Sequence, residues 1–197
     1  DRKIVFLQDN ETFSKKGVLY GWVQARGSLR RNLPLVVVEG YMDVIAVHRS
    51  GVAAAVAPLG TALTIEQVAL LWKLHDEPVL CFDGDVAGQN AQIRALERIL
   101  PVLEPGRSAR LAVLPQGKDP DDVILSSGVE GFSKIITTSQ SLADSLWETF
   151  YTKFDLRKPE SRALFWQAIR DRVRSIGHTQ VRSAYGDEVE SRIATMR

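Results

Sequence analysis

Residues 79–88 decide how this sequence folds, and they read Val-Leu-Cys-Phe-Asp-Gly-Asp-Val-Ala-Gly. Four apolar residues bounded by turn signals are typical of a central strand in a parallel sheet. Asp83 and Asp85 would then lie at the carboxyl end of that strand, which is the edge where open α/β sheets bind ligands. Gly84 permits a tight turn or a close approach of the backbone. The stretch therefore predicts a buried strand that presents two carboxylates.

Two carboxylates at this spacing admit two interpretations. They can hold a hard cation such as Mg²⁺, which proteins bind through a few carboxylates and the phosphates of a substrate. Alternatively, Asp83 caps the next helix and Asp85 is a solvated turn residue, because aspartate is common in turns. The Asp-Gly-Asp pattern by itself favours the second interpretation, so the choice depends on the rest of the chain.

The neighbouring elements alternate in type. Strands are predicted at 35–38, 53–57, 79–82 and 111–114, and helices at 41–50, 65–74 and 89–103. This order is typical of a parallel sheet covered by helices, in which all strands end at one edge. Acidic residues follow three of these strands: Glu39, then Asp83 with Asp85, then Asp119 with Asp121. We therefore expect five carboxylates to converge on that edge, and this convergence favours the metal interpretation.

Composition sets broad limits. The 197 residues suit one large domain or a domain with an appendage, and the net charge of +1 gives no overall basic signal. The only cysteine, Cys81, lies in an apolar run, which excludes an internal disulfide and suits a reducing compartment. The sequence shows no apolar stretch of membrane-spanning length and no signal-peptide pattern. It begins at Asp1, and we expect it to be a piece of a longer polypeptide.

The two ends of the chain differ from its acidic middle. Residues 1–33 are basic, with Lys15 and Lys16 before Gly17, helical spacing at 18–23 and a basic loop at 27–32. From about Phe132 onward the pattern predicts helices and no further strands. We therefore expect the chain to end in a small α-helical subdomain.

Other catalytic patterns are absent from the sequence. His48, His75 and His178 lack the spacing of a zinc enzyme. No glycine-rich loop ends in Gly-Lys-Ser/Thr, and no G-x-S-x-G motif supports a serine nucleophile. Carboxylates around Mg²⁺ suit chemistry on phosphate esters, because the metal neutralises phosphoryl oxygens and activates a hydroxyl nucleophile.

Four segments, in this order, resemble the bacterial replicative primases of the DnaG type, whose catalytic domain has the Toprim fold. They are Val-Val-Glu-Gly-Tyr-Met-Asp-Val at 37–44, Leu-Gly-Thr-Ala-Leu-Thr at 59–64, Phe-Asp-Gly-Asp-Val-Ala-Gly at 82–88 and Gly-Lys-Asp-Pro-Asp-Asp at 117–122. Phe-Ser-Lys-Lys-Gly at 13–17 and Leu-Tyr-Gly at 19–21 are similar to the basic segment that precedes Toprim in that family.

The resemblance implies a DNA-directed RNA polymerase, a nucleotidyltransferase that makes short RNA primers on single-stranded DNA from ribonucleoside triphosphates. It implies Mg²⁺ as the cofactor, for which Mn²⁺ can substitute. The family's catalytic, metal-binding acids match Glu39, Asp83 and Asp85, and its further acidic pair matches Asp119 and Asp121. Lys16, together with Lys15 and Lys118, would bind nucleotide or nucleic acid. Asp43 matches too, but a residue at a helix start is equally explained by the helix dipole.

The same resemblance sets the expected organisation. We expect an α/β fold, with a Toprim-like parallel sheet covered by helices and then a small α-helical subdomain. The predicted divisions are a basic segment at 1–33 that ends the preceding polymerase subdomain, a Toprim catalytic domain at 34–130 and helices at 131–197. The family further implies a cytoplasmic, nucleoid-associated bacterial protein without membrane contact.

Several parts of such primases have no counterpart in this sequence. They are the zinc-binding domain, the N-terminal half of the polymerase core and the domain that binds the replicative helicase. Because that half supplies much of the basic groove for single strands, we expect the isolated chain to polymerise poorly. Two alternatives stay open, namely a Toprim-type nuclease or topoisomerase, and a non-catalytic module that binds Mg²⁺ without turnover.

Overall fold

A computed structural model describes residues 17–59 and 62–196 of the chain. It contains a six-stranded sheet in the order β1-β3-β2-β4-β5-β6. Its four central strands are parallel: β3 (Ala54–Pro58), β2 (Leu35–Val37), β4 (Val79–Cys81) and β5 (Arg110–Ala112). Val37 of β2 pairs with Val56 on one side and Leu80 on the other. The four predicted strands and their parallel arrangement are thus confirmed.

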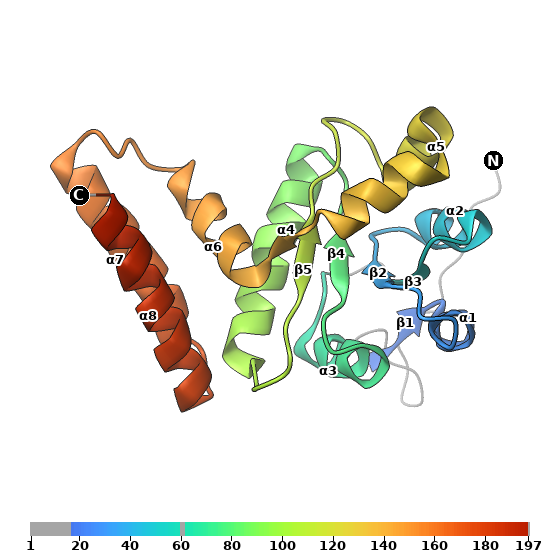
Figure 1. Ribbon diagram of the computed structural model, residues 1–197, viewed down its shortest axis with the longest axis horizontal. Helices are drawn as coiled ribbons and strands as arrows, with labels where there is room; N and C mark the ends of the chain where they lie inside the picture. Colours follow the sequence, from blue (N-terminus) through green and yellow to red (C-terminus); the bar gives the residue numbers. More distant parts are fainter. Residues whose placement is uncertain (1–16, 60–61, 197) are drawn as a thin grey trace.

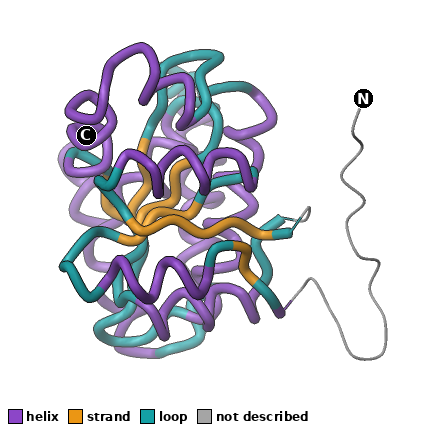
Figure 2. Tube along the Cα trace, turned by 90° about the vertical axis from the view of Figure 1, so that its right-hand side faces the viewer, coloured by secondary structure: helices purple, strands orange, loops and turns teal. Residues whose placement is uncertain are grey.

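Helices connect these strands and form a layer on each face of the sheet (Figure 2). They are α2 (Tyr41–Ser50), α3 (Ile65–Leu74), α4 (Val86–Ile99) and α5 (Pro120–Thr137). Strand residues alternate between two cores: Val36 and Cys81 pack with α2 and α5, whereas Val37 and Leu80 pack with α3 and α4. Burial on both faces explains why the strands are uninterrupted apolar runs.

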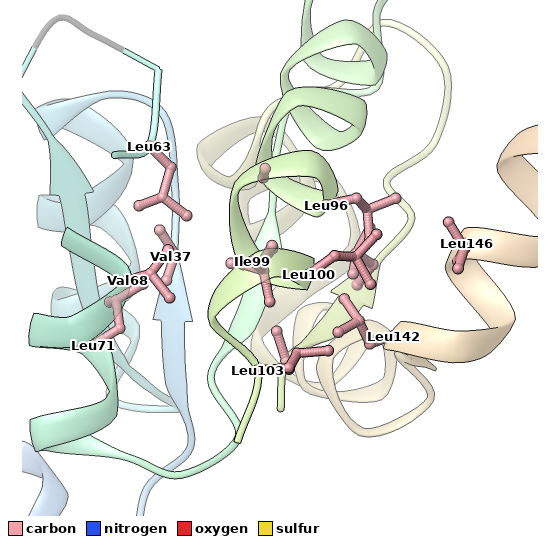
Figure 3. Close-up of a cluster of buried hydrophobic side chains, with 14 of the residues drawn as sticks. Val37, Leu63, Val68, Leu71, Leu96, Ile99, Leu100, Leu103, Leu142 and Leu146 are labelled. Atoms are coloured by element: carbon pink, nitrogen blue, oxygen red, sulfur yellow. The ribbon is translucent and has the colours of Figure 1, made fainter. Parts of the chain in front are cut away.

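The core on the α3 and α4 face continues into the C-terminal helices. These are α6 (Leu142–Tyr151), α7 (Pro159–Arg174) and α8 (Thr179–Thr195), and α7 and α8 lie side by side in Figure 1. Figure 3 shows Leu96 and Leu100 of α4 directed toward Leu142 and Leu146 of α6. The fully buried Phe165 of α7 belongs to the same cluster. One continuous apolar core therefore joins the sheet to the helical end.

The outer strands correct two sequence-based expectations. Leu19–Tyr20 forms β1, antiparallel to β3, where helical spacing was expected. Gln140–Ser141 forms β6, antiparallel to β5, although strands were expected to end before Phe132. The sheet is therefore mixed, with parallel centre and antiparallel edges. Two-residue strands carry no periodic signal, so sequence patterns cannot reveal them.

Helix limits follow the predicted signals with a few changes. Thr64 caps α3, because its Oγ1 accepts the N–H of Gln67 at 3.2 Å while the Gln67 side chain accepts the N–H of Thr64 at 3.0 Å. The basic loop expected at 27–32 starts later than predicted, since helix α1 spans Trp22–Leu29 and the turn covers residues 30–32. Helix α4 ends at Ile99, and Pro101 lies in the 3₁₀ turn η2 (Leu100–Val102). Within the described residues, no helix combines the length and apolarity needed to cross a membrane.

Candidate metal centre

The carboxyl ends of β2 and β4 meet through an acidic side chain. Glu39 follows β2, and its Oε1 accepts a hydrogen bond from the backbone N–H of Asp83 at 3.1 Å. Asp83 itself follows β4, 44 positions further along the chain. The parallel register places both strand ends at one edge, so this predicted pair is brought together.

Asp83 lies at the centre of the acidic residues. Its Oδ1 is buried and has no hydrogen-bond partner among the described residues. Burial and, after it, the negative charges of four neighbours together raise the pKa of Asp83 to about 7. These neighbours are Glu39, Asp43, Asp119 and Asp85. A buried carboxylate among like charges is unstable without a proton or a cation.

Asp43 belongs to this cluster as well. It lies in the first turn of α2, is 8% exposed, and its Oδ2 accepts the backbone N–H of Gly40 at 3.1 Å. Burial raises the pKa of Asp43 to about 6, followed by the charge of Asp119. The sequence interpretation left Asp43 out of the metal set and assigned it to the helix dipole. The structure gives it both roles, a cap and a member of the acidic cluster, and the only sequence signal was its match to the family motif.

Asp85 and Asp119 each begin a helix. Asp85 Oδ1 accepts the N–H of Gly88 at 2.8 Å at the start of α4, and Asp119 Oδ1 accepts the N–H of Asp122 at 2.7 Å at the start of α5. The capping interpretation therefore named the wrong aspartate, since Asp85 and not Asp83 caps α4. Each cap uses one carboxylate oxygen, so the second oxygen is left for another partner.

The remaining predicted residues lie at different places. Asp121 is half-buried in the first turn of α5, where its charge raises the pKa of Asp43. Lys118 is half-buried in the loop before α5 and forms no ion pair with the described part of the chain. Lys15 and Lys16 fall outside the described residues. The assignment of these residues to metal or nucleotide stays a prediction.

Two backbone hydrogen bonds hold the acidic loops together. The N–H of Gly84 donates to the Lys118 carbonyl at 2.8 Å, and the N–H of Gly117 donates to the Gly84 carbonyl at 3.0 Å. A Cβ atom on Gly84 would lie 2.1 Å from the Pro115 carbonyl oxygen. Glycine is therefore required at position 84 by the close approach of two main chains.

Substitution of Gly84 by alanine is expected to destabilise the fold by about 2–3 kcal/mol, because the backbone oxygen of Pro115 would have to move. Urea denaturation measures the effect. Gly27→Ala serves as the control, because a Cβ at Gly27 meets nothing within 4 Å. That exposed helical position should gain about 0.5–1 kcal/mol from alanine. Equal urea midpoints for Gly84→Ala and the wild type would contradict the close approach.

The cluster fits a hard divalent cation by its chemistry. Within residues 17–59 and 62–196, no three His, Cys, Asp or Glu side chains are arranged as a ready coordination shell. Every donor at the edge is nonetheless a carboxylate oxygen, the ligand that Mg²⁺ and Mn²⁺ prefer. The unpartnered Oδ1 of Asp83 is the oxygen that most requires a cation.

The sequence of the chain is similar to that of known proteins. Residues 34–111 match the model of the Toprim domain. The DNA primase of Rickettsia bellii is 35% identical over 182 residues, which cover 91% of this chain and 30% of that relative. The chain thus spans less than a third of that relative's length.

Two solved structures are similar over nearly the whole chain. A DNA primase domain from Pseudomonas aeruginosa has a TM-score of 0.85 and 34% identity, and the match covers 93% of this chain and 58% of that one. A DnaG primase catalytic domain bound to single-stranded DNA has a TM-score of 0.81 and 32% identity, covering 93% and 59%. Sequence and fold together establish that this chain belongs to the bacterial DnaG-type DNA primases and carries the Toprim part of their catalytic core.

Proposed function

We propose that this chain provides the metal-binding half of a primase catalytic centre, which joins ribonucleotides into short RNA primers on a single-stranded DNA template. The observation that carries the proposal is the Asp83 carboxylate, whose buried Oδ1 lacks a partner among four other acids. The similar catalytic domain bound to single-stranded DNA supports the nature of the template. A replicative helicase and the bacterial nucleoid would be reached through parts of the protein outside this chain.

Glu39, Asp83 and Asp85 would hold the first ion, and Asp119 and Asp121 would complete or extend the site. The bound ion, Mg²⁺ with Mn²⁺ as a substitute, would supply neutralisation of phosphoryl oxygens and activation of the hydroxyl nucleophile. The protein positions the carboxylates. The hydrogen bond between Glu39 and the Asp83 N–H and the backbone bonds of Gly84 fix the loops from which these side chains extend. The backbone bonds of Gly84 hold in place the two loops that carry these carboxylates.

Lys118 would bind the phosphates of an incoming nucleotide. Its carbonyl accepts the N–H of Gly84, so its side chain starts directly beside the acidic edge. An unpaired ammonium group next to a metal site attracts phosphate as a point charge. Lys15 and Lys16 would act on nucleotide or template from the preceding segment. The organisation that we propose keeps the Toprim domain at 34–130 and the helical subdomain at 131–197.

The test combines metal binding with a product assay. Binding of Mn²⁺ to the chain is measured by electron paramagnetic resonance. The chain is then incubated with single-stranded DNA, Mg²⁺ or Mn²⁺ and labelled ribonucleoside triphosphates, and the products are separated on a denaturing gel. We expect metal to bind and product to be weak. RNA oligomers that disappear in Asp83→Asn would support a complete centre, and shortened DNA would indicate a nuclease instead. A chain that binds no metal would overturn the proposal.

A further inference from the structure

We propose that a cavity beside the acidic edge receives the nucleobase of a nucleotide whose phosphates meet the metal centre, and that Arg94 covers this base. The inference rests on the proposed function, since it takes phosphates at the strand ends as its starting point. It assigns to this chain a binding residue that neither the acidic motifs nor the lysines include.

The cavity lies on the α3 and α4 side of the sheet. Its volume is about 250 Å³, and its lining includes Glu39, Pro58, Leu63, Phe82, Ala91 and Arg94. Three of these residues come from the ends of β2, β3 and β4, and two come from α4. Figure 3 shows Leu63 between the sheet and α4. Glu39 therefore belongs both to the acidic cluster and to the cavity wall, which makes the two sites adjacent.

The lining favours a flat, uncharged ligand over a phosphate. The apolar part of the wall comes from Leu63, Phe82 and Ala91, and the charged part comes from Glu39 and Arg94. The Glu39 carboxylate would repel a free phosphate, and the Arg94 guanidinium balances that charge. A nucleobase has apolar faces for such walls and polar edges for the two charged groups. Planar guanidinium groups also stack on bases, which a lysine cannot do.

Arg94 is available for a ligand. Its side chain is exposed and forms no ion pair with the residues that the structure describes. Other exposed arginines, such as Arg98 on the same helix, also form no ion pair with the described residues, so what distinguishes Arg94 is its place in the cavity wall together with Glu39. A guanidinium that no ion pair holds in place is free to turn over a bound ligand.

The position of the cavity suits a nucleotide bound at the acidic edge. Glu39 lines the cavity, and its Oε1 also accepts the backbone N–H of Asp83 at 3.1 Å. Phosphates at Asp83 and a base in the cavity can therefore belong to one molecule.

The test uses the whole chain and adenosine without metal or phosphate. Methyl groups of Leu63 and Ala91 are labelled with ¹³C, and their chemical shifts are followed by NMR during the titration. We expect both methyl signals to move in a saturable manner. Arg94→Ala should weaken this binding by roughly 3- to 10-fold, the usual range for a guanidinium over a ring. Arg98→Ala, one turn further along the exposed side of α4, is the matched control and should leave the affinity unchanged.

Three outcomes would overturn the proposal. Adenosine that leaves both methyl signals in place would show that the cavity binds no base. Equal affinities of Arg94→Ala and the wild type would remove Arg94 from the site. Inorganic tripolyphosphate that moves the signals where adenosine does not would show an anion site. Because the titration contains no metal, loss of Mn²⁺ binding would contradict the proposed function and leave this readout unaffected.

Discussion

Replacement of Asp83 by asparagine is expected to stabilise the metal-free chain and to remove its response to divalent metal. Burial and four acidic neighbours raise the pKa of Asp83 from 3.8 to about 7 in the folded chain. The folded state therefore binds this proton more tightly than the unfolded state does. The stability that protonation contributes is fully present below pH 4, declines as the pH rises and is lost above about pH 7.

The size of this change in stability follows from the pKa shift of Asp83 and from the exposure of its side chain to solvent. At roughly 1.4 kcal/mol per pKa unit, the full shift corresponds to about 4 kcal/mol. Asp83 is partly exposed, so solvent screens its neighbours, and we expect about 1–2 kcal/mol. Asp83→Asn should thus be more stable than the wild type at pH 8 by about 1–2 kcal/mol, with little difference at pH 4. Urea denaturation at both pH values measures this.

Divalent metal is expected to reverse the order of stability, so that the wild type becomes more stable than Asp83→Asn. Mg²⁺ at about 100 times its dissociation constant should stabilise the wild type by about 2.7 kcal/mol and the variant not at all. Asp187→Asn on α8 is the control, because this exposed aspartate lies on the helical end of the chain. Its urea midpoint should shift with metal as in the wild type. A metal-induced shift that survives in Asp83→Asn would remove Asp83 from the site.

Truncation of Phe165 to alanine is expected to cost about 3–5 kcal/mol, the largest loss of stability that we predict. Phe165 is fully buried on α7, and its ring meets Trp147 edge-on with centroids 5.1 Å apart. Tyr151 and Phe154 approach it at 6.2 Å and 6.1 Å. A cavity among three rings cannot close by small shifts, so both the transfer and the cavity contributions are lost.

The same variant tests the division of the chain. Because one apolar core runs from the sheet to α8, we expect the sheet and the helices to lose stability together. Amide hydrogen exchange at β4 and at α8, recorded at increasing urea concentrations, measures the stability of both regions. Leu164→Ala, at a 57% exposed position of the same helix, should change stability by less than about 0.5 kcal/mol. Helices that unfold while β4 keeps its wild-type protection would show that 131–197 is an independent unit.

The centre of the fold was predictable because its physics is local and repetitive. A strand buried on both faces must be apolar at every position, as Leu35, Val36 and Val37 are. A helix start such as Thr64 is visible when a cap and its reciprocal partner lie three residues apart. β1 and β6 depend instead on pairing with residues far along the chain, such as Leu19 with Pro58. No short window of sequence contains that information.

The acidic edge was predictable in its members and not in their detailed roles. Strand ends at one edge follow from a parallel sheet, which explains why Glu39 and Asp83 were expected to meet. The cap of α4 was assigned to the wrong residue because the helix begins at Val86, three residues before the expected start. Asp43 faces the cluster because of how α2 lies on the sheet, and Arg94 lines the cavity for the same reason on α4. Rotation of a helix about its axis is set by packing, not by its own sequence.

The short antiparallel strands at the two margins of the sheet have a consequence for crowded solutions. β1 and β6 span two residues each, so within the described residues the outermost strands offer very short rows of open N–H and C=O groups. Long exposed margins are templates on which other chains add strands and grow into fibres. Here the longer parallel strands lie inside, already paired on both sides. Within the described residues, the most apolar strands therefore offer no open margin on which another chain could add a strand.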